Sequence, residues 1–502
     1  MSLAIAVTLA GCSVGPDYQK PFTLMPSEYL PQAGENAARL TTAAIADLTQ
    51  WWRILNDQEL DSLVARARES NLDLAIALDR LQEARTGVTI AASQGLPVVG
   101  ATGGGGVGTG SDETKGRVSQ ALRSAENAQN LQSINEAGGL DASWELDLIG
   151  KFRREVEAQT ADAEALKDAH DWALVTVAAD VARSYLDMRA QQRQLVVLGQ
   201  NIAAARGNID LAQRRFSRGL TNAIDVSLAR RQVETLQADR APLVAQIDAS
   251  RHAIAVLLGL FPEELAKELA KPGAIPALPV KIQVGQPIDL LRRRPDIREA
   301  ERRLAAANAR IGVATADLFP TVVLSGAAGA QGGIRSASAV PITWIGSLGP
   351  SLYWPLLDFG ALDAQIEIAD LQTHETLVAY KQSILMAVQQ VDNANTSYRA
   401  QLERLKSLDS ALAAAREATQ IATERYDRGL TDFLNVLDAE RQEFDLEARH
   451  VATRQAAADD LVALYKALGG GWLLNEPIPP IRTPLPAAIA AAKYLLAPAQ
   501  IH

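Results

Sequence analysis

The sequence predicts a mainly α-helical, internally duplicated fold that carries transmembrane β strands. Three observations support this fold class. The same motif occurs twice, starting at Arg215 and again at Arg425. Long segments rich in Ala, Leu, Arg, Glu and Gln have a composition typical of helices. Short segments between them alternate apolar and polar residues, as strands with one apolar face do.

The duplication is clearest in two stretches that match at nine of eighteen positions without a gap, RFSRGLTNAIDVSLARRQ (215–232) and RYDRGLTDFLNVLDAERQ (425–442). A second pair is NLDLAIALDRLQEARTGVTIAASQGLPVVGATGG (71–104) and RPDIREAERRLAAANARIGVATADLFPTVVLSGAAG (294–329). Each half therefore has a helix, two strands, a very long helix and a returning helix. The expected helices are 57–93, 151–218 and 222–260, then 288–317, 361–428 and 432–468.

The stretch 361–428 contains no helix breaker. At about 1.5 Å per residue, such a helix is roughly 100 Å long. Its apolar residues recur at steps of three and four, with Asn395 as a polar member, which predicts a coiled-coil-like seam. The seam comprises Ile384, Val388, Val391, Asn395, Tyr398, Leu402, Leu405, Leu408 and Leu412.

Two segments carry the strand signal. In DASWELDLIG (141–150), Ala142, Trp144, Leu146 and Leu148 alternate with polar residues, and WIGSLGPSLYWPLLD (344–358) alternates more weakly, with Leu348, Leu352 and Trp354 on one face. A soluble sheet would show this pattern too. A transmembrane barrel needs strands of about 9–11 residues. Four strands cannot enclose an interior, whereas three chains would supply twelve, so we expect a ring of repeated units.

The N-terminus, MSLAIAVTLAGCSVGPDYQKP, places an apolar run and small residues directly before Cys12. This pattern resembles a bacterial lipobox, which predicts a signal peptide at 1–11 and a lipid on Cys12 after cleavage. Ser13, rather than Asp, after the cysteine favours sorting to the outer membrane. The alternative is a cysteine buried in a short apolar helix. The rest of the chain has no apolar run of roughly 18 residues, so no transmembrane helix is expected.

Several function classes are disfavoured by composition. The net charge is −10, whereas nucleic-acid binding needs a basic face. The five histidines, at positions 170, 252, 374, 450 and 502, lack metal-ligand spacing. The stretch GATGGGGVGTG (100–110) has no following Lys-Ser/Thr and is not a phosphate loop. We therefore expect no enzymatic activity, no metal site and no cofactor except the covalent lipid on Cys12.

The repeated turn Arg-Gly-Leu-Thr closes a helical hairpin in each half. Gly219 and Gly429 can take the backbone angles that end one helix. The next helix can be capped by Thr221 or Asn222 in the first half and by Thr431 or Asp432 in the second. A turn does not require the arginine and leucine that are also repeated. The candidate contact residues are therefore Arg218, Leu220, Arg428 and Leu430, and the alternative is an ordinary turn with solvated arginines.

Together these features resemble the TolC-like outer membrane factors, in particular the lipoprotein (NodT/OprM-type) branch that serves RND (resistance–nodulation–division) efflux pumps. The resemblance covers about residues 12–475 and rests on VGPDYQKP, LLRRRPDIREAERRLAAANARIGVATADLFPTVVLSG, SWELDLIGK and YDRGLTDFLNVLDAERQ. It implies a homotrimer with a 12-stranded β-barrel in the outer membrane, joined to a long periplasmic α-helical barrel with a mixed equatorial domain.

The resemblance also implies a function. The chain would be the passive exit duct of a tripartite efflux pump in a Gram-negative outer membrane, with an inner-membrane RND-type transporter and a periplasmic adaptor as partners. The turns 218–220 and 428–430 would bind the adaptor. Asp225 and Asp438 would face the lumen as a gate, with Asn435 where some relatives carry another acid. The alternative for both acids is favourable charge in the first turn of a helix.

The expected domains follow the duplication. The N-terminal part is a signal peptide (1–11) and a lipidated extension with an equatorial segment (12–56). The first repeat (57–260) has strands at about 95–109 and 136–149, and a linker (261–287) joins it to the second repeat (288–468), which has strands at about 318–331 and 342–358. A C-terminal equatorial segment and tail (469–502) ends the chain.

Two alternative functions stay open. One is a non-conducting coiled-coil scaffold lipoprotein of the cell envelope, which would not need the alternating strands. The other is the duct of a type I protein secretion system.

Overall fold

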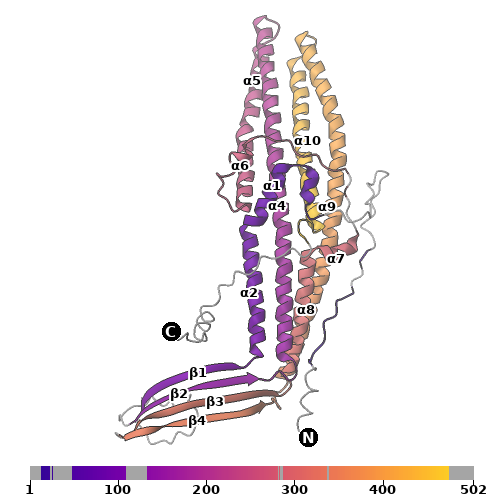
Figure 1. The fold of residues 1–502 in the computed structure, drawn as a ribbon. Helices are drawn as coiled ribbons and strands as arrows, with labels where there is room; N and C mark the ends of the chain where they lie inside the picture. The colour runs from indigo at the N-terminus through magenta and orange to yellow at the C-terminus, as the bar shows by residue number, and fades with distance from the viewer. Residues whose placement is uncertain are drawn as a thin grey trace. The chain divides into compact units, whose positions relative to one another are not determined.

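A computed structural model describes residues 13–22, 25–26, 48–108, 133–280, 282, 286–335 and 338–473. The chain divides into two compact units. The first holds the described residues of 1–24, 83–168 and 296–383, and the second holds those of 25–82, 169–295 and 384–502. Each unit therefore takes equivalent segments from both repeats, which the colours of Figure 1 make visible.

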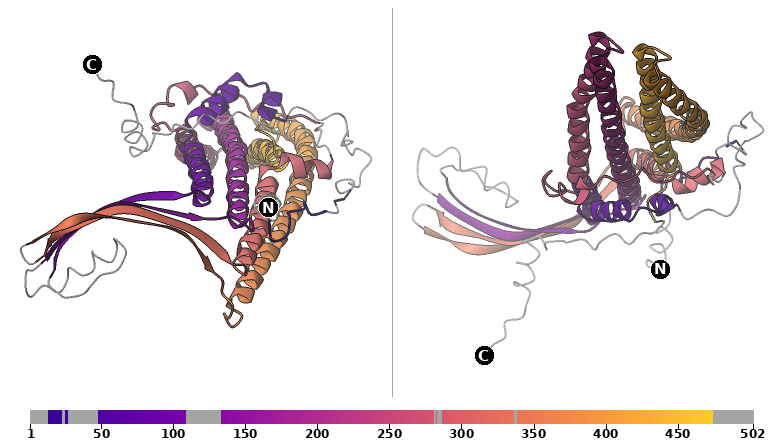
Figure 2. Two further views of the ribbon diagram at one scale, coloured as in Figure 1. Left: turned by 60° about the horizontal axis from the view of Figure 1, so that its bottom comes forward. Right: turned by 90° about the horizontal axis from the view of Figure 1, so that it is seen from above.

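The first unit contains a four-stranded antiparallel sheet in the order β1-β2-β3-β4. The strands are β1 (Val98–Gly108), β2 (Ser133–Glu145), β3 (Thr321–Arg335) and β4 (Ser338–Tyr353). Each repeat supplies one pair of strands, and the pairs join where β2 lies beside β3, with Trp144 opposite Leu324. Figure 2 shows the sheet as a long curved ribbon whose edges are β1 and β4.

All four predicted strands occur, but two of the predicted ranges, 136–149 and 342–358, were placed too late, because β2 ends at Glu145 and β4 at Tyr353. Two equivalent tryptophans mark where the chain leaves the sheet. Trp144 donates its indole N–H to the carbonyl of Gly95 at 2.9 Å, and Trp354 donates to Leu318 at 3.1 Å. The apolar residues that follow lie in the turn toward a helix and not in the strand.

The predicted alternation is confirmed within β4. Side chains two residues apart point to the same face of a strand. The even-numbered apolar residues are exposed on that face, namely Ile342, Trp344, Leu348 and Leu352. Trp354, which we expected on this face, lies beyond the end of the strand.

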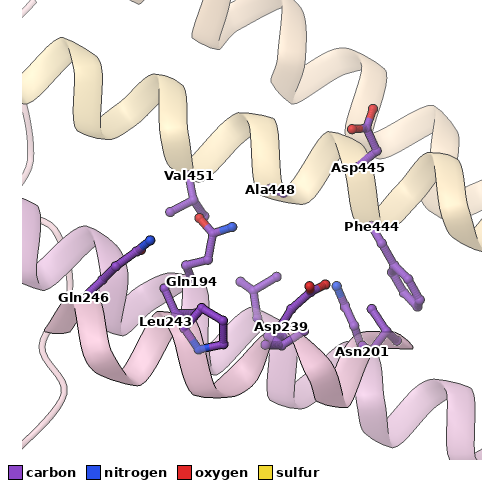
Figure 3. A pocket seen from close by; sticks show the side chains of 13 residues that line it. Gln194, Asn201, Asp239, Leu243, Gln246, Phe444, Asp445, Ala448 and Val451 are labelled. Carbon is purple, nitrogen blue, oxygen red and sulfur yellow. The ribbon is translucent and has the colours of Figure 1, made fainter. Parts of the chain in front are cut away.

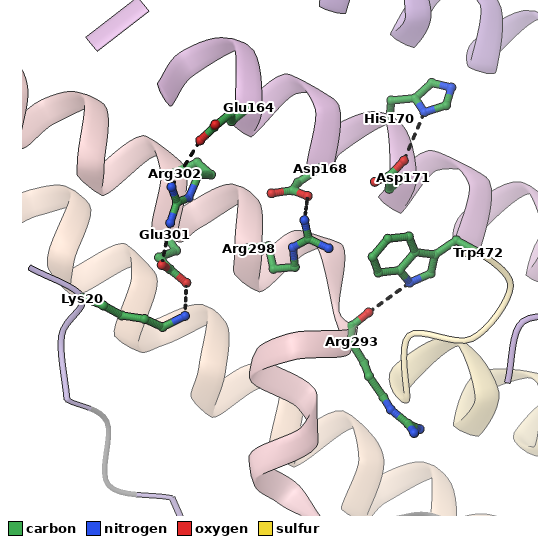
Figure 4. Close-up of polar contacts among 10 residues, drawn as sticks. All are labelled: Lys20, Glu164, Asp168, His170, Asp171, Arg293, Arg298, Glu301, Arg302 and Trp472. Carbon is green, nitrogen blue, oxygen red and sulfur yellow. Dashed lines mark hydrogen bonds and ion pairs between the residues drawn. The ribbon is translucent and has the colours of Figure 1, made fainter. Parts of the chain in front are cut away.

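Four helical segments belong to the first unit together with the sheet. They are the end of α2 (Leu72–Gln94), α8 (Pro295–Ala316) and the first parts of α4 (Lys151–Ser217) and α9 (Ala361–Asp427). The two long helices follow Gly150 and Gly360, whose φ angles of +83° and +84° suit glycine. Ion pairs join α8 to α4, including Arg298 with Asp168 at 2.8 Å (Figure 4).

Residues 13–22, here called the N-terminal strap, dock onto the first unit. The N–H of Val14 donates to the carbonyl of Ile149 at 3.1 Å. The buried guanidinium of Arg154 donates to the carbonyls of Val14 and Gly15 at 3.0 and 3.2 Å, and to Asp17 at 2.7 Å. One side chain thus binds two backbone carbonyls and one carboxylate of the strap.

Two further contacts fix the strap. Lys20 donates to Glu301 at 2.5 Å, as Figure 4 shows. Gly15 lies against the backbone of Gly312 so closely that a Cβ atom on Gly15 would clash with it. Only glycine permits this approach. Cys12, the predicted lipidation site, lies outside the described residues.

The second unit contains two long helical hairpins. One joins the later part of α4 to α5 (Ala223–Ala238) and α6 (Arg240–Leu257). The other joins the later part of α9 to α10 (Phe433–Ala467). Figure 1 and the right-hand view of Figure 2 show the hairpins side by side. The unit also contains α1 (Gln58–Ser70), α7 (Leu290–Arg293) and short 3-10 helices at Trp51–Leu55, Glu268–Ala270 and Pro287–Asp289.

The two very long helices and the helix at 432–468 are confirmed to within one residue. The other three predicted helices are interrupted, so those predictions were wrong. Helix 57–93 breaks at Asn71, whose side chain caps the next helix by accepting from Leu74 N–H at 3.0 Å. Helix 222–260 breaks at Asp239, because Pro242 has no N–H for the carbonyl four residues earlier. Helix 288–317 breaks at Arg294, since a residue before proline avoids the helical conformation.

The predicted seam of α9 is also confirmed. Its members in the second unit are buried or half-buried, and Ile384, Val391 and Tyr398 are almost fully buried. Asn395 is buried among them. The apolar face that the spacing predicted is therefore the face that packs inside the unit.

Candidate functional site at the hairpin tips

The two hairpin turns have the same backbone geometry. Gly219 and Gly429 have φ angles of +71° and +74°. In each turn the leucine N–H donates to the carbonyl of the arginine five residues earlier, at 2.9 Å for Leu220 and 2.8 Å for Leu430. Left-handed glycine commonly ends a helix in this way, because a Cβ atom there is unfavourable. The prediction that both glycines take the backbone angles that end a helix is confirmed.

The caps differ between the halves. The Asn222 side chain accepts from the N–H of Ile224 at 2.9 Å and caps α5, as expected. Asp432 makes no side-chain cap hydrogen bond at the start of α10. The second cap prediction therefore fails for Asp432, although the turn itself is unchanged.

The tips present apolar side chains to solvent. Leu220 is 59% exposed and Leu430 is 62% exposed, and the turn arginines Arg218 and Arg428 are exposed as well. The sequence reasoning missed a second exposed pair, Ile224 and Leu434, each 62% exposed in the first turn of its helix. Their equivalent positions in the two repeats were the available signal. Each tip therefore carries two repeated apolar side chains near an arginine.

Asp225 does not stand alone in the first turn of α5. Its carboxylate accepts a hydrogen bond from the hydroxyl of Thr221 and another, at 3.0 Å, from the hydroxyl of Tyr426 at the end of α9. Tyr426 is only 2% exposed, and burial together with the Asp225 carboxylate raises the pKa of its hydroxyl. The bond connects the first hairpin to the second. Sequence reasoning missed Tyr426.

Arg215 completes this link. Its guanidinium lies over the ring of Tyr426, with 4.6 Å between its central carbon and the ring centroid. It also donates to the carbonyls of Tyr426 and Asp427 at 2.5 and 2.8 Å. A cation on an aromatic face and a charged donor on helix C-terminal carbonyls are both favourable. We call Arg215, Asp225 and Tyr426 the tip joint.

The structure does not bring Asp438 into the tip joint. Its side chain is exposed on α10, and among the contacts of the described residues none joins it to Asp225. Asn435, the repeat equivalent of Asp225, is also exposed and donates to the hydroxyl of Thr431 at 2.7 Å. The two predicted gate acids thus have different surroundings within one chain.

Behind the tip joint the hairpins share a core. Tyr426, Phe433 and Val436 are buried against Ala229 of α5. One turn further in, buried Asn208 of α4 donates to buried Glu440 of α10 at 2.5 Å, and burial raises the pKa of that carboxyl group. This pair adds a polar tie between α4 and α10 inside the chain.

A groove of about 380 Å³ lies further along the hairpins, where α5 gives way to α6. Figure 3 shows Asp239 and Leu243 from that break on one side and Val451 and Phe444 of α10 on the other, with Asn201 of α4 beside Asp239. Asp239 and Pro242, at the break between α5 and α6, form part of the lining of this groove.

Within the described ranges, no group of three His, Cys, Asp or Glu side chains is placed to hold a metal ion. The same part of the chain contains no helix that is long and apolar enough to cross a membrane.

Comparison with known proteins identifies the family. Residues 63–260 and 287–470 match the family described as outer membrane efflux protein. This chain belongs to the outer membrane efflux protein family. The matched segments cover most of both repeats, so the duplication is itself the family's pattern in this chain.

This outer membrane efflux protein resembles its relatives along nearly its full length. It is 32% identical to Nodulation protein T of Rhizobium leguminosarum bv. viciae over 97% of this chain and 96% of that protein. It is 28% identical to cation efflux system protein CusC of Escherichia coli O6:H1, over 94% and 98% of the two chains. The solved outer-membrane channel OprN is 34% identical, with a TM-score of 0.80 over 92% of this chain and 100% of that one.

The family settles the class of function. The chain is an outer-membrane exit duct for efflux in a Gram-negative bacterium and reaches into the periplasm. It is a transport conduit and not an enzyme. The likeness to OprN confirms the predicted TolC-like fold class. Membership implies trimeric assembly and work with an adaptor and an inner-membrane pump.

Proposed function

We propose that the tip joint holds this outer membrane efflux protein closed as a homotrimer, and that a periplasmic adaptor opens it by binding the hairpin turns. The observation that carries the proposal is the hydrogen bond from Tyr426 to Asp225, 3.0 Å long. It ties the start of α5 to the end of α9. The two hairpins of one chain can separate at the tip only after this bond breaks.

The acids near the tip set the charge of the opening. Three copies place three Asp225 and three Asp438 carboxylates around one mouth. Clustered carboxylates in a narrow wet pore attract cations and repel anions. Asn435 adds no charge at the position equivalent to Asp225. The closed duct therefore conducts little and prefers cations.

The exposed turns are the surface for the adaptor. Leu220 and Leu430 are apolar knobs at otherwise polar tips, and Ile224 and Leu434 extend the apolar surface by one turn. Arg218 and Arg428 supply donors for the carbonyls of a partner. Apolar side chains with a polar rim are the usual composition of a protein–protein contact. Because each chain carries the motif twice, a trimer offers six such sites.

We assign an RND-type transporter as the inner-membrane partner. On this proposal the transporter, and not the duct, selects the transported molecules. The names of similar proteins include a cation efflux protein, an antibiotic efflux pump protein and a toluene efflux pump protein. Such different cargoes with similar full-length ducts are expected when the duct conducts passively. Small molecules then pass from the periplasm to the outside without chemistry in this chain.

We further propose that Cys12 carries covalent lipid that anchors the chain in the outer membrane. The support comes from the strap that follows it. Val14 is hydrogen-bonded to Ile149, four residues after the end of β2, so the strap starts close to the strands. A lipid attached just before the strap would lie beside the membrane-embedded part.

The test is planar-bilayer conductance of the purified full-length protein. Tyr426→Phe removes one hydroxyl and the tip bond, and Asp225→Ala/Asp438→Ala removes both acids. We expect small, cation-selective conductance for the wild type, several-fold larger conductance for both variants, and weaker cation selectivity for the double variant only.

A matched control keeps this test specific. Tyr185→Phe also removes a buried tyrosine hydroxyl that donates to an aspartate, Asp57, at 2.7 Å, but far from the tip along α4. It should leave conductance unchanged. Equal conductance in the wild type and both tip variants would discard the gate, and silence in all of them would discard the duct.

A further inference from the structure

We propose that the free edge of the second hairpin binds the first hairpin of a second copy through a joint that repeats the tip joint, with Phe216 of the second copy in the place of Tyr426. This inference rests on the proposed homotrimer. It specifies which residues meet between copies, and it predicts that these joints lack the hydrogen bond that locks each chain internally.

The repeat alignment supplies the equivalences. Phe216 follows Arg215 as Tyr426 follows Arg425, and Asn435 stands where the first repeat has Asp225. The backbone supports the alignment, since the glycine and leucine N–H groups of both turns make equivalent hydrogen bonds and the two glycine φ angles differ by only 3° (+71° and +74°). Equivalent side chains therefore start from equivalent positions on the two hairpins.

The equivalent aromatic side chains differ in how much of their surface is exposed to solvent. Tyr426 is 2% exposed because the first hairpin covers it, whereas Phe216 is 49% exposed. Tyr426, the counterpart of Phe216, is buried by the edge of the first hairpin. We therefore expect the exposed ring of Phe216 to pack against an equivalent hairpin edge. In the part of the chain that the structure describes, the equivalent edge belongs to the second hairpin, where Arg425 and Asn435 are exposed.

Arginine shows the same division. Arg215 stacks on Tyr426 and donates to two carbonyls. Arg425, its equivalent at the end of α9, is exposed, and the described contacts give its guanidinium no partner. On the proposed joint it stacks on Phe216 of the second copy and donates to the carbonyls at the end of that copy's α4.

The two joints differ at one decisive point. Within the chain, a tyrosine hydroxyl donates to the Asp225 carboxylate. Between copies, Phe216 has no hydroxyl and Asn435 has no charge, so this charge-assisted bond cannot form. The exposed amide of Asn435 instead bonds to Thr431.

The helices behind the tip repeat this difference. Inside the chain, buried Asn208 donates to buried Glu440. The equivalent positions are Ala418 on α9 and Arg230 on α5, which are both exposed. The side chain of Ala418 cannot form a hydrogen bond. A trimer would therefore have three joints within chains that contain the tyrosine–aspartate hydrogen bond and three joints between copies that lack it.

Cross-linking in membranes tests the geometry. The full chain carrying Phe216→Cys and Asn435→Cys is treated with a short bifunctional thiol reagent and separated on a denaturing gel. We expect dimer and trimer bands. The same reagent on Asp225→Cys with Tyr426→Cys should link residues within one chain and give monomers only. Chains with one of these changes alone control for reaction at Cys12.

The outcomes separate this inference from the proposed duct. Native trimers without links between Phe216→Cys and Asn435→Cys would overturn the joint but keep the homotrimer. Multimer bands from the control pair would also overturn it. Absence of native trimers would overturn both proposals.

Introducing the tyrosine–aspartate pair at the joint between copies provides a second test. Phe216→Tyr combined with Asn435→Asp recreates the internal bond at the joints between copies. We expect several-fold lower conductance in planar bilayers than the wild type, with each single change close to the wild type. Unchanged conductance in the double variant would contradict the unlocked joint.

Discussion

At the scale of single residues, two adjacent arginines have opposite roles. The Arg154 side chain is 5% exposed and holds the N-terminal strap through three hydrogen bonds. The Arg153 side chain is 45% exposed and pairs with Asp147 at 3.1 Å. Position on α4 decides between them, because only Arg154 points at the strap. Exposed ion pairs contribute little, whereas a buried guanidinium with fixed acceptors contributes more.

We therefore predict that Arg154→Ala loosens the strap. Losing several charged hydrogen bonds should lower the free energy of opening residues 13–22 by about 2–4 kcal/mol. Hydrogen exchange of the peptide that contains Val14 measures this opening, because the Val14 N–H is bonded to Ile149. Arg153→Ala is the matched control and should leave exchange of the strap unchanged. Equal exchange in both variants would show that Arg154 does not hold the strap.

At the scale of elements, the returning helices of the two repeats differ. The first is broken into α5 and α6 near Pro242, whereas α10 runs unbroken from Phe433 to Ala467. The unbroken helix packs against α4 along a seam with charged members. Gln455 of α10 donates to Asp187 of α4 at 2.6 Å, and Asp459 lies nearby.

That seam makes stability depend on pH. Burial and the Asp187 carboxylate raise the pKa of Asp459 to about 7, although Arg183 at 3.9 Å acts in the opposite direction. A carboxyl group with a raised pKa binds more protons when folded than when unfolded. Between about pH 4 and pH 7, stability therefore falls as pH rises. The cost is absent at low pH and complete above pH 7.

We predict that Asp459→Asn removes this cost. The variant should gain about 1–2 kcal/mol at pH 8 and less than half of that at pH 5, because asparagine resembles the protonated acid and only part of the cost is present at pH 5. Thermal melting followed by helical circular dichroism at both pH values measures the gain. Asp445→Asn, on the same helix in an exposed pair with Arg449, should show no gain at either pH. A gain of the same size at both pH values would refute titration of Asp459 as the cause.

At the scale of the whole molecule, duplication is the main organising feature. Each compact unit is built from equivalent segments of both repeats, and the sheet joins one strand pair from each. A duct of three such chains therefore has six similar walls. The two repeats are similar enough to pack in the same way. They differ at the tip, where Tyr426 can bond to Asp225 but Phe216 has no hydroxyl to donate to Asn435.

The anchor belongs to this scale, because it concerns where the whole chain resides. We predict that Cys12→Ser abolishes incorporation of labelled palmitate and blocks processing at 1–11. The variant should then accumulate in the inner-membrane fraction at the expense of the outer membrane, because sorting depends on the lipid. Density-gradient fractionation measures the shift, with Ser2→Cys, a thiol outside the lipobox, as control. Undiminished palmitate labelling of Cys12→Ser would exclude this site.

Several features of the protein were determined by its sequence alone. The duplication, the bounds of the two longest helices, the α9 seam and the turn glycines all follow from local signals. Periodicity and backbone preference depend on neighbours along the chain, so they can be predicted without knowing the packing. The helix breaks at Asn71, Asp239 and Arg294 had local signals too, since two of them precede a proline within three residues.

The tertiary structure alone decided which of two equivalent residues is used. Tyr426 and Phe216 have equal places in their repeats, yet one is buried in the tip joint and the other is exposed. Asp225 was singled out through the family resemblance, but its partner Tyr426 lies 201 positions away in the chain. No local pattern encodes that pairing. It exists because the packing of two hairpins brings the end of α9 against the start of α5, and buried polar groups then bond to whatever partner that packing supplies.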